Sequence, residues 1–149
     1  MALSGRPGEP SYDGMVGRTD LQKTRNGQPK PALIQVLWLA ALTATVVGEL
    51  LPGNSTAMRW VGATHINDKV LHFTAYAVLA FLPVFGFKLR SGIPLAASMI
   101  LLGVVLEFAQ RLVPFRSFEI ADMMANAMGV LAGMVLALMG QAWMASVET

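Results

Sequence analysis

Residues 103–133 read GVVLEFAQRLVPFRSFEIADMMANAMGVLAG, two apolar runs separated by a short polar interruption. A soluble amphipathic helix would spread its polar groups along one whole face. Here they crowd around the interruption, and the sequence on both sides is almost uncharged. The crowded side chains are Glu107, Gln110, Arg111, Arg116, Glu119, Asp122 and Asn126. This pattern indicates two apolar helices whose polar ends meet at a turn.

The composition is that of a membrane protein. Of the 149 residues, 54% are hydrophobic and only 13% are charged, whereas soluble domains carry about 25% charged residues. The chain has no cysteine, which excludes disulfides, a thiolate nucleophile and a Cys-based metal site. The ten methionines are scattered without a repeated ligand spacing, so we expect them to fill packing and lipid-facing surfaces.

Four apolar runs follow the N-terminal region, at residues 31–52, 70–87, 93–113 and 120–143. Each is close to the ~20 residues that a spanning helix needs. The water-free core of a bilayer forces the backbone polar groups of each segment to pair internally, as a helix does. The sequence therefore predicts an all-α fold, a polytopic membrane protein built as a bundle of four transmembrane helices.

Residues 1–30 differ from the rest of the chain. They are rich in Gly, Pro and Ser and hold five of the eleven Lys and Arg residues. Such a segment buries too little apolar area to offset the entropy lost on ordering. We expect a disordered basic tail at 1–30 and a membrane domain at 31–149. The Lys and Arg residues near the helix ends favour a cytoplasmic location for both termini.

Four spans place the start of the second helix, the end of the third and the start of the fourth at one membrane face. That face collects a set of polar side chains, which we call the polar layer. The polar layer consists of Asp68, Lys69, His72, Tyr76, Glu107, Gln110, Arg116, Ser117, Asp122 and Asn126. These are the candidate residues of a ligand-binding or functional site.

The helical spacing of these residues supports the prediction that they gather in one layer. Asp68, His72 and Tyr76 follow one another at intervals of four residues, so they share one side of their helix. Asp122 and Asn126 have the same interval. The stripe on the fourth helix continues into two glycines at a small-xxx-small spacing, which lets another helix approach closely. These glycines are Gly129 and Gly133.

Glu107 is the member of the layer that costs the most free energy to place in the membrane. It lies about 10 Å below the membrane surface if the helix rises 1.5 Å per residue, and intramembrane ionisable groups normally face the bundle interior and pair. One interpretation is structural, with Lys69 or Arg116 neutralising Asp122 or Glu107. Metal ligation by Asp68, His72, Glu107 and Asp122 is a further alternative, although no ligand spacing supports it. Two carboxylates, Glu49 and Glu119, are expected to be interfacial.

Two segments carry a resemblance to a known family. DKVLHFTAY at 68–76 and EFAQRLVPFRSFEIADMMANAMGVLAG at 107–133 resemble the VanZ-like family over residues 50–139. The matching positions are the polar layer with Gly129 and Gly133. The resemblance implies a multi-pass protein of the bacterial inner membrane whose family's founding member lowers susceptibility to teicoplanin, a glycopeptide bearing a lipid chain. It implies no settled reaction. The tail at 1–30 and the C-terminal end of the chain lie outside the region of resemblance.

Three functions remain open. The polar layer could recognise a lipid or a lipid-linked envelope molecule, with Arg116 and Lys69 binding an anionic head group. It could be catalytic, with Glu107 or Asp122 and His72 as acid and base on a lipid-linked substrate. The chain could also be a small subunit that packs its glycines against a protein partner. We expect contacts with membrane lipids, and no cofactor, metal or nucleic-acid partner.

Overall fold

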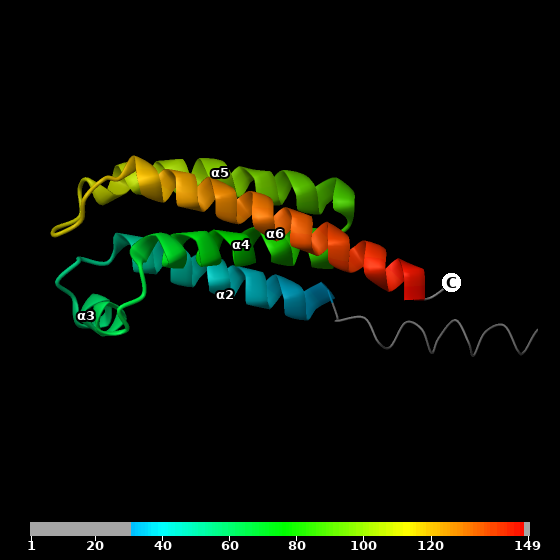
Figure 1. Ribbon diagram of the computed structural model, residues 1–149, viewed down its shortest axis with the longest axis horizontal. Helices are drawn as coiled ribbons and strands as arrows, with labels where there is room; N and C mark the ends of the chain where they lie inside the picture. Colours follow the sequence, from blue (N-terminus) through cyan, green and yellow to red (C-terminus); the bar gives the residue numbers. More distant parts are fainter. Residues whose placement is uncertain (1–30, 148–149) are drawn as a thin grey trace, which may run out of the picture. The chain divides into compact units, whose positions relative to one another are not determined.

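The computed structural model describes residues 31–147. This part of the chain is all helical, with α2 (Pro31–Leu50), α3 (Thr56–Ala63), α4 (Asp68–Gly86), α5 (Leu89–Gln110) and α6 (Ile120–Val147). By length and composition, α2, α4, α5 and α6 are able to cross a membrane. They lie side by side as a bundle (Figure 1), which confirms the predicted fold class. The predicted tail at 1–30 lies outside the described residues.

The third span lies a few residues earlier than the sequence predicts. The apolar run covers 93–113, but α5 begins at Leu89 and ends at Gln110. The backbone N–H groups of Leu112 and Val113 donate to carbonyls three residues back, which closes a tight turn. Pro114 follows directly, and the residue before a proline is disfavoured in helical geometry. The apolar side chains of this turn therefore continue the hydrophobic run without continuing the helix.

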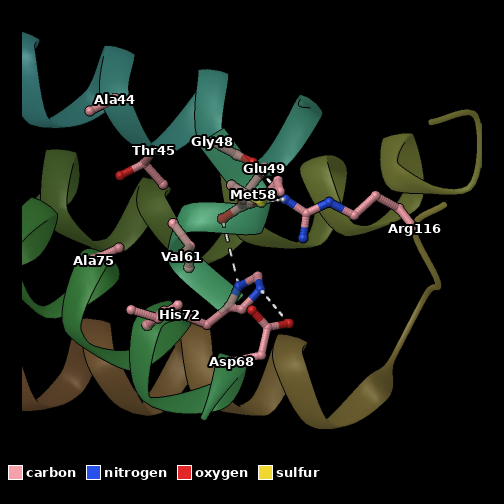
Figure 2. Close-up of a pocket in the computed structure, with 11 residues that line it drawn as sticks. Ala44, Thr45, Gly48, Glu49, Met58, Val61, Asp68, His72, Ala75 and Arg116 are labelled. Atoms are coloured by element: carbon pink, nitrogen blue, oxygen red, sulfur yellow. Dashed lines mark hydrogen bonds and ion pairs between the residues drawn. The ribbon is translucent and has the colours of Figure 1, made fainter. Parts of the chain in front are cut away.

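The short helix α3 has no counterpart among the predicted runs. Ser55 caps it by accepting a hydrogen bond from the backbone N–H of Met58, and it ends before His65, whose φ is 55°. Eight residues are too few for a spanning pattern, so the hydropathy signal passes over it. Two of its side chains, Met58 and Val61, line a pocket shared with α2 and α4 (Figure 2).

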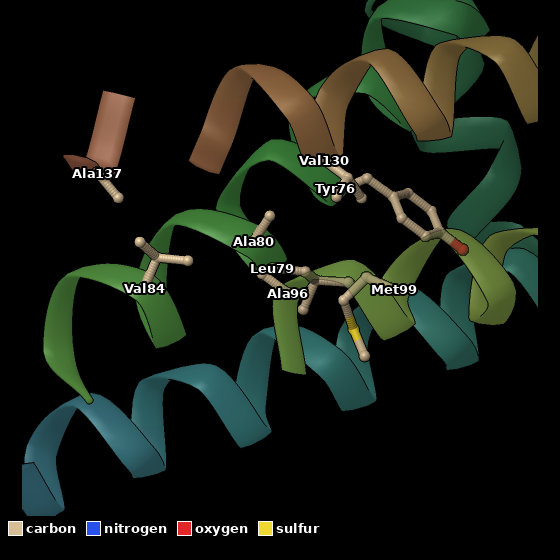
Figure 3. Close-up of a cluster of buried hydrophobic side chains, with 8 residues drawn as sticks. All are labelled: Tyr76, Leu79, Ala80, Val84, Ala96, Met99, Val130 and Ala137. Carbon is tan, nitrogen blue, oxygen red and sulfur yellow. The ribbon is translucent and has the colours of Figure 1, made fainter. Parts of the chain in front are cut away.

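The apolar core lies between α4, α5 and α6 (Figure 3). Its buried side chains are Tyr76, Leu79, Ala80, Val84, Ala96, Met99, Val130 and Ala137. Most other large apolar side chains are on the outside; Leu101 on α5 is 66% exposed and Leu136 on α6 is 57% exposed. An apolar outer surface suits a bundle surrounded by lipid.

The two glycines of α6 bring it against α4. A Cβ atom on Gly129 would overlap the carbonyl oxygen of Phe73, and one on Gly133 would overlap that of Ala77. The helix that approaches these glycines closely is therefore α4 of the same chain. The alternative in which they pack against a protein partner does not fit this arrangement, because α4 already occupies that face.

Candidate functional site

One end of the bundle gathers the C-terminal ends of α2 and α5, the N-terminal ends of α4 and α6, and α3 (Figure 1). The polar layer lies at this end. Most of its members are buried, with exposed fractions of 6% or less. The buried members are His72, Tyr76, Glu107, Gln110, Asp122 and Asn126. They point into the bundle, in agreement with their helical spacing.

His72 stands at the centre of the layer. Its Nδ1 is 3.0 Å from Oδ1 of Asn126 on α6, a hydrogen bond in the interior of the bundle. The same nitrogen lies 3.7 Å from Oε1 of Glu49, and Nε2 lies 3.8 Å from Oδ2 of Asp68. One imidazole is thus flanked by two carboxylates and one amide, from three different helices.

Glu49 lies in the last turn of α2, where an interfacial position is expected, but its side chain is buried in the bundle. The residue is only 6% exposed and faces His72. The physical reason is the packing of α2 against α4, because Glu49 lies on the side of α2 that faces His72 of α4. A single Glu near the end of an apolar run carries no signal of which helix its side chain will face.

Lys69 neutralises the acidic start of α6. Its Nζ donates to Oδ1 of Asp122 at 3.1 Å and to Oε2 of Glu119 at 2.8 Å. The hydrogen bond from Lys69 and its positive charge hold the pKa of Glu119 below the usual range. The carboxylate therefore stays ionised in mild acid, and its pairing is lost only as the pH falls through that lowered pKa. Pairing of Lys69 with Asp122 matches the structural interpretation of the sequence.

Glu107 is fully buried, and one of its two carboxylate oxygens has a hydrogen-bond partner. Oε1 accepts a hydrogen bond from the backbone N–H of Glu119 at 2.8 Å, which ties α5 to the segment before α6. The other oxygen is one of five buried polar atoms without a hydrogen-bond partner among the described residues. These atoms are Glu49 Oε2, Tyr76 Oη, Glu107 Oε2, Gln110 Nε2 and Asn126 Nδ2. Buried polar groups are normally paired, so these atoms have hydrogen-bonding capacity that the described residues do not use.

Of the two cations named in the structural interpretation, Lys69 pairs with a carboxylate of the layer, whereas Arg116 binds backbone carbonyls. Its guanidinium donates through Nη2 to the carbonyl of Gly48 at 2.7 Å and through Nε to that of Leu51 at 3.2 Å. The last carbonyls of a helix lack intrahelical partners, and a basic side chain satisfies them. Nη2 also lies 2.9 Å from Sδ of Met58. Ser117 is exposed and its hydroxyl donates to Glu119 Oε1 at 3.4 Å.

A pocket of about 300 Å³ opens beside the layer, between α2, α3 and the start of α4 (Figure 2). One part of its wall is polar and includes Glu49, Asp68, His72 and Arg116. The remaining wall is mainly apolar and is formed by Ala44, Thr45, Gly48, Met58, Val61, Leu71 and Ala75. Only part of the predicted polar layer reaches the pocket; Glu107, Gln110 and Asn126 do not line it.

A metal ion has a partial ligand set here. Asp68, His72 and Asp122 each offer a ligand atom, and these atoms lie within 4.8 Å of one another. Glu107, the fourth residue of the metal alternative, does not belong to this group. Asp122 already accepts a hydrogen bond from the ammonium of Lys69, which supplies the positive charge that a cation would bring. The three ligands therefore fit a metal poorly while Lys69 is in place.

Comparison with known proteins gives one match. The family model described as VanZ/LLP1 matches residues 19–141. The match is wider at both ends than the resemblance at 50–139, and it includes part of the region expected to lie outside. No curated protein matches the chain, and no solved structure matches it.

Proposed function

The chain belongs to the VanZ/LLP1 family, and on that basis we propose that it binds the polar head of an amphiphile in the pocket between α2, α3 and α4. The observation that carries the proposal is the pocket wall, which is polar around Glu49 and His72 and apolar elsewhere. Its volume of about 300 Å³ is at the lower end of the usual range for ligand sites. A head group fills such a space, and the tail extends along the bundle into the bilayer.

The position of the pocket supports this choice of ligand. It lies at the end of a bundle whose α2, α4, α5 and α6 are able to span a membrane, so a lipid reaches it without leaving the bilayer. The chain is thus a multi-pass membrane protein with a polar site beside one membrane face. We infer that the ligand is a lipid or lipid-linked molecule of the bacterial envelope, and that its capture lowers susceptibility to teicoplanin.

The test is susceptibility to teicoplanin, with vancomycin alongside, in a sensitive bacterial host that expresses the chain. The wild type is expected to lower teicoplanin susceptibility more than vancomycin susceptibility. Ala44→Phe fills the pocket from α2 and is expected to abolish the effect. Ala40→Phe, one turn earlier on the same helix, is the matched control, because Ala40 is exposed and does not line the pocket.

All variants are compared at equal abundance in the membrane. If Ala44→Phe protects the host as well as the wild type does, the pocket is not the site. If the wild type itself changes neither susceptibility, the link to teicoplanin is wrong. Glu107→Gln in the same assay reports whether the buried carboxyl group of the polar layer is needed.

Acid–base catalysis on the bound lipid is a second candidate function. The observation that favours it is His72, whose two ring nitrogens face Glu49 and Asp68 at the pocket wall. A carboxylate and an imidazole at a ligand site are the usual groups for proton transfer. Mass spectrometry of lipid extracts tests it. A converted lipid that appears with the wild type and disappears with His72→Ala or Asp122→Asn supports catalysis, and unchanged lipids leave a binding protein.

A further inference from the structure

We propose that the head group held in this pocket carries a positively charged ammonium, and that Glu49 is the residue that binds it. The inference rests on the proposed function, since it names the chemistry of the ligand for the same pocket. It differs from the expectation drawn from the sequence, in which Arg116 and Lys69 bind an anionic group.

Glu49 is a buried acceptor with unused capacity. The residue is 6% exposed, and its Oε2 is buried without a hydrogen-bond partner among the described residues. Its Oε1 lies 3.7 Å from Nδ1 of His72, which is beyond hydrogen-bond distance. That nitrogen already makes its hydrogen bond to Asn126 at 3.0 Å. A carboxylate removed from water in this way is costly unless a donor or cation satisfies it.

The nearby cations are committed elsewhere. Arg116 lines the pocket, but its Nε and Nη2 donate to the backbone carbonyls of Leu51 and Gly48. Lys69 does not line the pocket, and its ammonium bonds to Asp122 and Glu119. The hydroxyl of Tyr76 faces Glu49, but a neutral donor does not cancel a charge. No Lys or Arg of the described residues donates a hydrogen bond to Glu49. The unpaired Oε2 is therefore open to a donor on the ligand.

Charge balance selects the sign of that partner. The pocket wall carries two carboxylates, Glu49 and Asp68, and one permanent cation, Arg116. If only these three side chains are counted, all ionised, the wall has one excess negative charge. An ammonium cancels this excess, whereas a phosphate adds to it, and the effect is largest at Glu49, the buried carboxylate of the wall. Complementary charge at a binding site discriminates between partners of opposite sign.

The donor count fits a primary ammonium. Such a group has three N–H donors and no acceptor. The wall offers it two carboxylates as acceptors, those of Glu49 and Asp68. Glu49 and Asp68 face the two nitrogens of one imidazole, so both belong to the same polar end. Ala44 and Ala75 on the remaining wall suit the first carbons of an alkyl chain.

The experiment uses the full chain purified in a non-ionic maltoside detergent. Three probes share a dodecyl chain and differ only in the head: dodecylamine, dodecanol and dodecyl phosphate. Thermal unfolding is followed as each probe is added, because a ligand that binds only the folded state raises Tm with concentration. Dodecylamine is expected to raise Tm saturably at concentrations at which the other two do not.

The variants test the role of Glu49. Glu49→Gln is expected to weaken dodecylamine binding by about tenfold or more, equivalent to losing about one charge-assisted hydrogen bond. Asp68→Asn is the second variant, and it is safe for folding because the Asp68 side chain is 56% exposed. Glu119→Gln is the matched control, since it removes an exposed carboxylate outside the pocket. It should bind dodecylamine as the wild type does.

The outcomes separate this inference from the proposed function. If dodecyl phosphate or dodecanol binds and Ala44→Phe blocks it, the pocket binds amphiphiles but the ammonium assignment is overturned. If dodecylamine binds equally well to the wild type, Glu49→Gln and Asp68→Asn, the assignment is also overturned. If none of the three probes stabilises the wild type, both proposals fail.

Discussion

Lys69 shows how burial decides the value of an ion pair. Its ammonium contacts two carboxylates at similar distances, but the side chain of Glu119 is 48% exposed and that of Asp122 only 4%. An ion pair in solvent contributes little, because water already solvates both charges. A buried carboxylate that loses its partner has no such compensation. The contact with Asp122 is therefore the one on which the start of α6 depends.

Two substitutions separate the contacts of Lys69. Lys69→Met is expected to lower the Tm of the detergent-solubilised protein clearly, because Asp122 is left buried with no cation. Glu119→Gln is expected to shift Tm much less, although it removes the shorter of the two contacts. Thermal unfolding of both variants at neutral pH checks the order. Equal losses of Tm would mean that the exposed pair contributes as much as the buried one.

At the scale of the helices, α4 and α6 pack closely because two residues of α6 are glycines, which have no side chain. Gly129 and Gly133 allow the backbone of α6 to lie directly on the carbonyl oxygens of Phe73 and Ala77 in α4. Helix association in lipid relies on such close packing, because there is no hydrophobic driving force between helices there. The same contact brings Asn126 on α6 within hydrogen-bond distance of His72 on α4.

Gly133→Ala tests this packing. The added methyl group meets backbone, which cannot move aside alone, so α4 and α6 must separate. Overpacking of this kind costs about 1–3 kcal/mol, and we expect a matching loss in the free energy of unfolding in detergent. Gly62→Ala in α3 is the matched control, since nothing lies within 4 Å of its added Cβ. It should be neutral or stabilising by about 0.5–1 kcal/mol; a loss as large as that of Gly133→Ala would rule out the steric explanation.

At the scale of the whole molecule, the four long helices alternate in direction and place the candidate site at one end. The connection between α4 and α5 lies at the other end, with two cations beside it, Lys88 and Arg90 (Figure 1). Four further cations, Arg18, Lys23, Arg25 and Lys30, precede α2 in the sequence, which makes six near the ends of the helices on this side. The site end has four, Arg59, Lys69, Arg111 and Arg116. The side with more Lys and Arg is retained in the cytoplasm. This predicts that the site faces away from the cytoplasm.

Cysteine labelling tests the orientation directly, because the chain has no cysteine of its own. Thr64→Cys places a thiol in the exposed segment after α3, and Ser91→Cys places one at the start of α5. In intact cells, a membrane-impermeant maleimide is expected to label position 64 and not position 91. After the membrane is opened, both should react. Labelling of position 91 alone would reverse the orientation, and labelling of both positions in intact cells would contradict the bundle topology.

The sequence by itself determined the four spanning helices and the face at which the polar layer gathers. Both depend on local properties: the length of an apolar run, the need to pair backbone groups within it, and the period of the helix. For this reason the spacing and the number of spans are enough to group Asp68, His72 and Asp122. A close helix approach at Gly129 and Gly133 follows from their spacing in the same way, although the identity of the approaching helix does not.

Only the tertiary structure decided which groups meet. Glu49 turns inward because α2 packs against α4, which brings its carboxylate close to His72. Arg116 reaches the carbonyls of Gly48 and Leu51 at the end of α2 rather than the carboxylates nearer in sequence. The pocket lies between these two contacts. Each joins segments that are distant in the sequence, and its geometry depends on how helices cross and where a loop returns. A pattern within a single segment cannot predict such a contact, because the energy of the contact depends on both segments and on how they are placed.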